Sequence, residues 1–132
     1  MKFLLDTDTC IYALKRNQAV LGRLLASDRS DVAVSVITEA ELRTGAAKSS
    51  SAARTLRAVE NFLMPIEIVD FLSSDAASYA AIRTRLERAG TPIGPLDTLI
   101  AAQAIARKLT LVSNNEREFR RVSGLRVENW SS

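Results

Sequence analysis

The chain alternates short, mainly apolar runs with longer stretches in which apolar residues recur every three or four positions. The apolar runs lie at residues 2–5, 32–35, 66–69 and 109–113, and we expect a last short strand at residues 126–128. Short runs of this kind are typical of strands in a parallel sheet that is covered on both faces. The intervening periodicity predicts helices, which we place at residues 9–16, 18–26, 37–47, 52–63, 75–89 and 96–108, with a short one inside 114–121.

Strands that alternate with helices, without hairpin signals, predict an α/β protein with three layers, in which helices cover a central parallel sheet of four to five short strands. Glu67 interrupts the third run and favours an edge position for that strand. Thr9 is predicted to cap the first helix, and Ser73 or Ser74 the helix at 75–89. Pro95 suits the first position of the next helix. The absence of linkers and repeats predicts one domain spanning residues 1–132.

Composition removes several kinds of chemistry. The chain has no histidine and a single cysteine, Cys10, so Ser-His-Asp catalysis, Cys-His catalysis and thiolate zinc clusters are excluded. Cys10 is predicted to be a small buried hydrophobe. The net charge is +3 and 14 of the 18 basic residues are arginine, whose planar fork suits phosphate contacts. With no long apolar run and no leader pattern, we expect a cytoplasmic protein without membrane contact.

Acidic and amide side chains follow the ends of several predicted strands. Because the carboxyl ends of parallel strands open onto the crevice where ligands bind, these side chains should lie along one rim of the sheet. Asp6 closes the first strand, and Glu41 lies one turn into the helix that follows the second strand. Asp97 lies in the first turn of the helix at 96–108, and Asn115 and Glu118 follow the fourth strand.

Each acid also has an ordinary structural explanation. Asp97 near a helix N-terminus is favoured by the helix dipole in any protein, and Asp8 fits a cap or a turn. Glu39 and Arg43 are spaced as an exposed helix pair, which leaves Glu41 as the acid in an apolar setting. Glu118 lies in a charged stretch typical of a solvated surface. As a group, however, neighbouring carboxylates need a compensating cation, and oxygen ligands without histidine or thiolate favour Mg²⁺, with Mn²⁺ as a substitute.

Three segments resemble a known family. LLDTDTCIYALK, SVITEAELRTGAAKS and GTPIGPLDTLIAAQAIARKLTLVSNNEREFRRVSGLRVENW are similar, in order and spacing, to VapC-type toxins of the PIN-domain ribonuclease family. The similarity covers nearly the whole chain and is least diagnostic at residues 52–71. It implies a Mg²⁺-dependent endoribonuclease, the toxin of a toxin–antitoxin pair, with tRNA or another structured RNA as the typical target.

The resemblance also implies roles for individual residues. The acids of the family match Asp6, Glu41 and Asp97, and we match the fourth acid to Glu118. Asn115 occupies the position where many PIN domains carry an aspartate, so it is expected to be an additional polar ligand. Asp6, Asp97 and Glu118 would hold the principal metal, while Glu41 would bind a second metal or orient the attacking water.

Partners follow from the same resemblance. It implies a VapB-like antitoxin, a homodimer, and contact with promoter DNA only through the antitoxin. Apolar residues in the helices at 9–26 and 52–63 exceed what a small sheet can cover, which predicts an exposed apolar interface. Two further interpretations stay open: a catalytically silent RNA- or protein-binding module, and an aspartyl-phosphate phosphatase suggested by Asp6-Thr7-Asp8.

Overall fold

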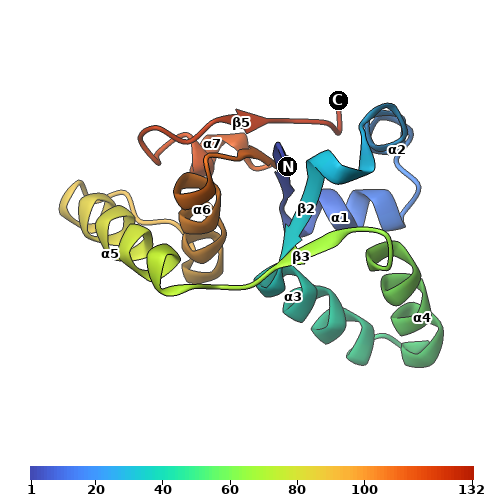
Figure 1. Ribbon diagram of the computed structural model, residues 1–132. Helices are drawn as coiled ribbons and strands as arrows, with labels where there is room; N and C mark the ends of the chain where they lie inside the picture. The colour runs from blue at the N-terminus through green and yellow to red at the C-terminus, as the bar shows by residue number, and fades with distance from the viewer.

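The computed structural model describes residues 1–132 and contains a five-stranded parallel sheet in the order β3-β2-β1-β4-β5 (Figure 1). The strands are β1 (Phe3–Leu5), β2 (Val32–Ser35), β3 (Glu67–Val69), β4 (Thr110–Val112) and β5 (Val127–Glu128). In the register of the central strands, Leu5 pairs with Val34 on one side and Val112 on the other. The predicted parallel sheet of short strands is therefore confirmed, and the strand that carries exposed Glu67 lies at an edge.

Seven α-helices and one short 3₁₀ helix connect these strands. They are α1 (Thr7–Leu14), α2 (Gln18–Ala26), η1 (Arg29–Asp31), α3 (Val36–Ala47), α4 (Ala52–Leu63), α5 (Ser73–Arg88), α6 (Pro95–Arg107) and α7 (Glu116–Phe119). Pro95 begins α6, as the sequence predicts. A proline is well suited to this position because its missing N–H has no partner inside the helix.

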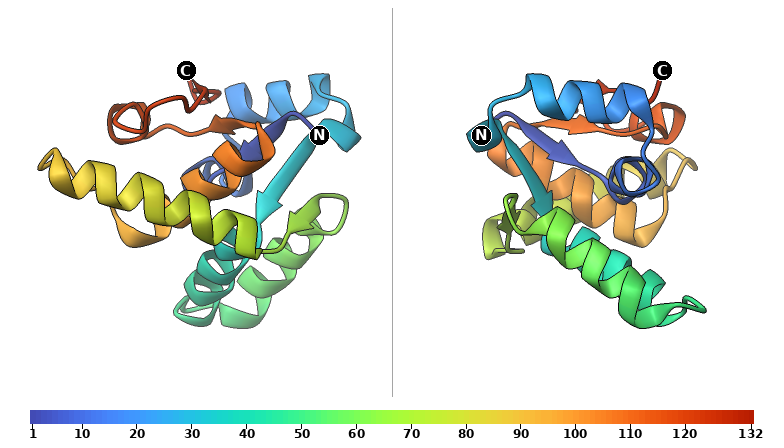
Figure 2. Two further views of the ribbon diagram at one scale, coloured as in Figure 1. Left: turned by 60° about the vertical axis from the view of Figure 1, so that its left-hand side comes forward. Right: turned by 90° about the vertical axis from the view of Figure 1, so that its right-hand side faces the viewer.

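The alternation of side chains along the strands divides the core into two clusters. Leu5, Val34 and Val112 face the side of the sheet on which α1, α2, α3 and α4 pack. Leu4, Ala33 and Leu111 face the opposite side, against α5, α6 and α7. The three-layer arrangement predicted from the sequence is thus confirmed, and α5 packs extensively on α6 at the outside of its layer (Figures 1 and 2).

Two predicted helix caps are wrong. The N-cap of α1 is Asp6, whose carboxylate accepts the Thr9 N–H at 2.9 Å, so the helix begins at Thr7 and Thr9 lies inside it. The N-cap of α5 is Leu72, and neither Ser73 nor Ser74 caps it. Asp75 instead accepts the Leu72 N–H at 2.7 Å. In α1 the Asp6 carboxylate accepts a free N–H of the first turn in a charge-assisted hydrogen bond, so the helix begins before Thr9. In α5 the N–H groups of Asp75 and Ala76 donate to the Leu72 carbonyl, so no serine hydroxyl is needed.

No helix of the structure is both long enough and apolar enough to cross a membrane.

Candidate active site

Asp6 lies at the carboxyl end of the central strand β1, where it is only 3% exposed. Its backbone N–H continues the sheet by donating to the carbonyl of Val112. Its two carboxylate oxygens are also engaged: Oδ1 accepts the Thr9 N–H, and Oδ2 accepts the Ser113 hydroxyl at 2.6 Å. Burial nevertheless outweighs these hydrogen bonds and raises the pKa of Asp6 to about 6.

Glu41 is brought towards this region by α3, the helix that follows β2. The Thr7 hydroxyl, which belongs to the residue after Asp6, lies 2.6 Å from Oε1 of Glu41 and 3.2 Å from the Thr38 hydroxyl. The first turn of α1 is therefore tied to α3 by its side chains. Glu39, by contrast, pairs with Arg43 at 3.0 Å on the outer side of α3, as the sequence predicts.

Asp97 lies in the first turn of α6 and is half-buried. Burial is the main cause that raises its pKa to about 6, and the charges of Glu118, Asp6, Glu41 and Asp8 add to the effect in that order. The four other acids thus surround Asp97 closely enough to act on its charge. The sequence predicts only that these acids lie along one rim; their effect on the charge of Asp97 indicates that they also approach one another.

Asn115 and Glu118 belong to one hydrogen-bonded unit after β4. The Asn115 side-chain amide donates to the Glu118 carboxylate, and the Asn115 backbone N–H donates to the Ser113 hydroxyl at 2.9 Å. Ser113 in turn donates to Asp6. A continuous chain of contacts therefore joins Asp6 to the segment that carries Glu118.

The electrostatics of the rim are unbalanced. None of Asp6, Asp8, Glu41, Asp97 and Glu118 forms an ion pair with a basic side chain, whereas the acids elsewhere in the fold frequently do. Like charges held together in this way repel one another unless a cation compensates them.

The donor set consists of carboxylate and amide oxygens, which fits a hard divalent cation. In the present side-chain positions, however, no group of three or more acidic side chains is arranged to hold a metal ion. Glu41 and Glu118 are held instead by Thr7 and Asn115. The residues fit such an ion in type and charge, and coordination would require these carboxylates to turn towards Asp6 and Asp97.

Sequence reasoning missed three hydroxyl residues: Thr7 and Ser113, which donate to Glu41 and Asp6, and Thr38, which contacts the Thr7 hydroxyl. Ser113 directly follows β4 and Thr7 is the second residue after β1; these positions at strand ends are the signal that could have found them. Cys10 is fully buried in the core, and burial raises the pKa of its thiol, so the predicted structural role of this residue is confirmed.

An apolar groove adjoins the acids. It has a volume of about 500 Å³ and lies between α1, α3 and α4, with Ile11, Leu14 and Val59 among its lining residues. Glu41 also lines it, so the groove and the acidic rim share one residue. A second apolar hollow of about 430 Å³ lies between α2 and the end of α4, and the exposed side chain of Leu25 lines it. The predicted excess of apolar surface on these helices is therefore present.

Comparison with known proteins agrees with this fold and this rim of acids. The PIN domain family model matches residues 3–125. The chain therefore belongs to the PIN-domain family.

Its relatives are VapC ribonucleases. The chain is 41% identical over 130 residues to the "tRNA(fMet)-specific endonuclease VapC" of Salmonella typhimurium and 41% identical over 130 residues to "Ribonuclease VapC2" of Haemophilus influenzae, covering 98% of both chains in each comparison. A crystal structure of DNA-bound VapBC from Salmonella typhimurium superposes with a TM-score of 0.94 at 41% identity and 98% coverage of both chains.

The predicted resemblance to VapC-type toxins is confirmed by these comparisons, and so is the predicted class of enzyme, a nuclease. Membership of this family removes the alternative of an aspartyl-phosphate phosphatase. PIN-domain nucleases are in general dependent on a divalent metal.

Proposed function

We propose that this chain is the toxin of a VapBC-type pair and an endoribonuclease that cleaves RNA with Mg²⁺ at the acidic rim. The single observation that carries this proposal is the convergence of four acids on Asp97 without any basic partner. A surface of that kind is costly for a folded protein unless a cation joins it. The whole chain would act as one PIN domain, since the family model leaves out only its first two and last seven residues.

The roles we propose follow from position. Asp6 is the most buried and most firmly held acid, so it would anchor the principal Mg²⁺ together with Asp97 and Glu118. Asn115 would orient Glu118 and could supply its own amide oxygen as a neutral ligand. Glu41, held at the opening of the apolar groove by Thr7, would serve a second metal or orient the attacking water.

When bound, the cation would neutralise charge on the scissile phosphate and lower the pKa of an attacking water. The side chains supply the rest. Asp6 and Asp97 bring fixed negative charge, Ser113 and Thr7 hold two of the acids in position, and Glu41 accepts a hydrogen bond that a water could replace. None of these side-chain roles requires an imidazole, in agreement with the absence of histidine.

We propose initiator tRNA as the first substrate to test. The support is the name of the Salmonella relative, a tRNA(fMet)-specific endonuclease, to which this chain is 41% identical over an alignment that covers 98% of both chains. The 14 arginines of this chain agree with a polyanionic partner.

The proposed regulator is a VapB-like antitoxin. An amphipathic segment of the antitoxin would place its apolar face in the groove between α1, α3 and α4. Because Glu41 lines both the groove and the acidic rim, the end of such a segment would reach the acids, where an Arg or Lys could replace the cation. We further propose that promoter DNA is contacted only through the antitoxin; the promoter-bound VapBC2 complex of Rickettsia felis supports a link between such a pair and its promoter. We also propose that the protein is cytoplasmic, because tRNA and promoter DNA are both found in that compartment of a bacterium.

The test is incubation of purified protein with initiator tRNA in Mg²⁺, with sequencing of the ends that are produced. We expect cleavage at defined positions, with 5′-phosphate and 3′-hydroxyl products, that stops when the metal is chelated. A purified chain that binds tRNA yet never cuts it, in Mg²⁺ or Mn²⁺, would instead support the catalytically silent binding module.

A further inference from the structure

A small basic hollow lies on the face of α5 that looks towards the segment after α7. Its volume is about 220 Å³. Two guanidinium groups and two hydroxyl groups line it, over an apolar floor: Arg85, Arg121, Ser78 and Ser123, with Leu86 and Val122 among the floor residues. No acidic side chain lines this hollow.

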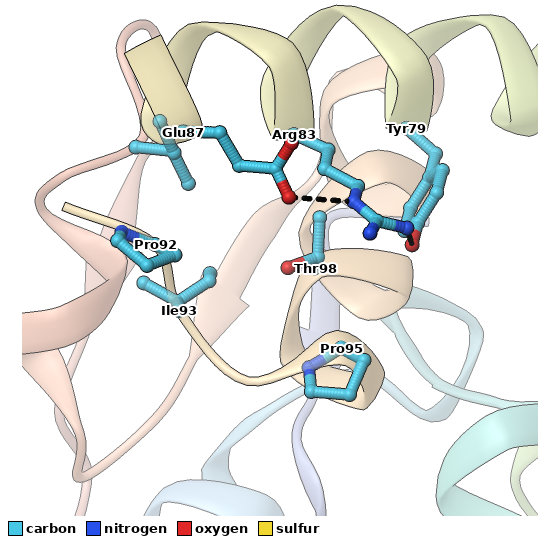
Figure 3. Close-up of a pocket in the computed structure, with 8 residues that line it drawn as sticks. Tyr79, Arg83, Glu87, Pro92, Ile93, Pro95 and Thr98 are labelled. Atoms are coloured by element: carbon cyan, nitrogen blue, oxygen red, sulfur yellow. Dashed lines mark hydrogen bonds and ion pairs between the residues drawn. The ribbon is translucent and has the colours of Figure 1, made fainter. Parts of the chain in front are cut away.

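The arginines of the hollow differ from their neighbours in being free of carboxylates. Arg83, on the adjacent face of α5, donates to Glu87 and to the Tyr79 hydroxyl, both at 3.0 Å (Figure 3). Arg120 pairs with Glu116 in the same way. Neither Arg85 nor Arg121 takes part in an ion pair. Two uncompensated guanidinium groups with nearby hydroxyls form a site suited to a phosphate.

Arg121 connects this hollow to the acidic rim. Its backbone N–H donates to the carbonyl of Glu118 at 3.0 Å, so the two residues lie one turn apart. Its guanidinium Nη1 donates to the carbonyl of Pro92 at 3.0 Å, at the start of the turn that leads to Asp97. Arg121 therefore connects the hollow to two of the chain segments that carry acids of the rim, those of Glu118 and Asp97.

We propose that the Arg85–Arg121 hollow binds a backbone phosphate of the RNA within a few nucleotides of the bond that is cut. This inference rests on the proposed ribonuclease function and adds a subsite to it. The acids of the rim repel RNA wherever no cation screens them, so affinity for the strand must come from basic groups beside the rim. Arg85 is the clearer of the two to test, since it is exposed and its side chain forms no hydrogen bond, whereas Arg121 also supports the turn before Asp97.

The experiment measures binding separately from cleavage. Fluorescein-labelled initiator tRNA is titrated with the Asp6→Asn protein and with the same protein carrying a second substitution, over a series of NaCl concentrations. We expect Arg85→Ala to weaken binding about fivefold to tenfold and to reduce the slope of log K against log[salt] by about one, as for the loss of one phosphate contact. Arg85→Lys keeps the charge but loses the planar guanidinium group, so its affinity for tRNA should fall between those of the Asp6→Asn protein and the Arg85→Ala variant.

The matched control is Arg57→Ala. Arg57 is an exposed arginine of α4 that does not line the hollow and forms no ion pair, so this change alters the net charge equally. We expect it to leave the Kd within twofold of the parent. Thermal melting of each variant shows whether a loss reflects unfolding, and Arg121→Lys provides a second, independent substitution that should also weaken binding.

An unchanged Kd and salt slope for Arg85→Ala would overturn the proposal, and so would an equal loss in Arg57→Ala. Weaker antitoxin binding with normal tRNA binding would also overturn it, because the hollow would then be a protein contact. Failure of the proposed function looks different: the parent protein itself would not cleave tRNA in Mg²⁺, whatever Arg85 contributes to binding.

Discussion

The Ser113 hydroxyl donates a 2.6 Å hydrogen bond to Oδ2 of Asp6, across 107 positions of the chain. Strands β1 and β4 are neighbours in the sheet, so the residue that follows one strand meets the residue that follows the other. The same Ser113 accepts the backbone N–H of Asn115, whose amide holds Glu118. One serine thereby connects the first acid of the rim to the last.

Asp6→Asn and Asp97→Asn should each abolish RNA cleavage while the fold is retained. The amide keeps the shape of the side chain but removes charge that a bound cation requires. We expect the rate to fall at least about 100-fold, since even changes to the outer partners of a metal site cost up to about that much. Gel assays of tRNA cleavage in Mg²⁺, with circular dichroism for the fold, measure this; cleavage at the parental rate by either variant would disprove the metal site.

Glu118→Gln should lower the activity more than Asn115→Ala. Glu118 supplies charge, whereas Asn115 supplies at most a neutral ligand and a hydrogen bond that positions Glu118. Cleavage rates under saturating Mn²⁺ provide the ranking. Glu39→Gln is the control and should behave as the parent, because Glu39 pairs with Arg43 away from the rim. If Asn115→Ala proves the worse variant, the assignment of the fourth acid is wrong.

Thr7→Val should lower the activity about tenfold, with little effect on stability. The substitution keeps the shape of the side chain but removes the hydroxyl that donates to Glu41 at 2.6 Å. A loss of this order matches the lower end of what an outer partner of a metal site contributes. Thr7→Ser keeps the hydroxyl and should restore the rate; if it is as slow as Thr7→Val, the hydrogen bond is not the cause.

The metal-free protein should lose stability as the pH rises from about 4 to about 6. The folded pKa of Asp6 is about 6, above its ordinary value of 3.8, so the folded state binds the proton more tightly than the unfolded state and its advantage disappears as the proton leaves. For Asp6 the shift corresponds to about 3 kcal/mol. Urea unfolding at pH 4.5 and pH 7 samples about two thirds of this change, so Asp6→Asn should reduce the difference in unfolding free energy by about 2 kcal/mol.

Metal binding should become stronger as the pH rises, the opposite direction to the stability of the metal-free protein. Because a cation needs both carboxylates ionised, Mn²⁺ should raise the melting temperature at pH 7.5 and have little effect at pH 5, below the pKa of about 6 of Asp6 and Asp97. Asp97→Asn should abolish the shift at pH 7.5. An equal rise at both pH values would mean that the ion binds elsewhere.

The active protein should be a dimer, and an antitoxin should inhibit it through basic residues. The exposed apolar surface around α2 and α4 supports an interface, with Leu25 87% exposed and Met64 79% exposed. Light scattering at micromolar concentration tests the first point, and a monomer would disprove it. For the second, co-purified antitoxin with all basic residues near its C-terminus changed to Ala should no longer inhibit; persistent inhibition would exclude competition with the cation.

The sequence by itself determined the class of fold and most of the candidate site. Alternating apolar runs and helical periodicity are local properties, and they were sufficient to place all five strands and the seven α-helices that connect them. A parallel sheet also places every strand end at one rim, which brought Asp6, Glu41, Asp97 and Glu118 together in the prediction. The two wrong caps show the limit of such reasoning: the first turn of α1 is capped by Asp6 rather than Thr9, and that of α5 by the Leu72 carbonyl rather than by a serine.

Only the tertiary structure decided which side chains touch. The order β3-β2-β1-β4-β5 places β4 beside β1, and this neighbourhood gives Asp6 its serine partner. The packing of α1 on α3 gives Glu41 its threonine, and burial, together with the closeness of the other acids, raises the pKa of Asp97. Each of these interactions depends on the distance between residues that are far apart in the chain. Burial and Coulomb interactions depend on those distances, whereas the periodicity of a sequence reports only on neighbours within a helix or a strand.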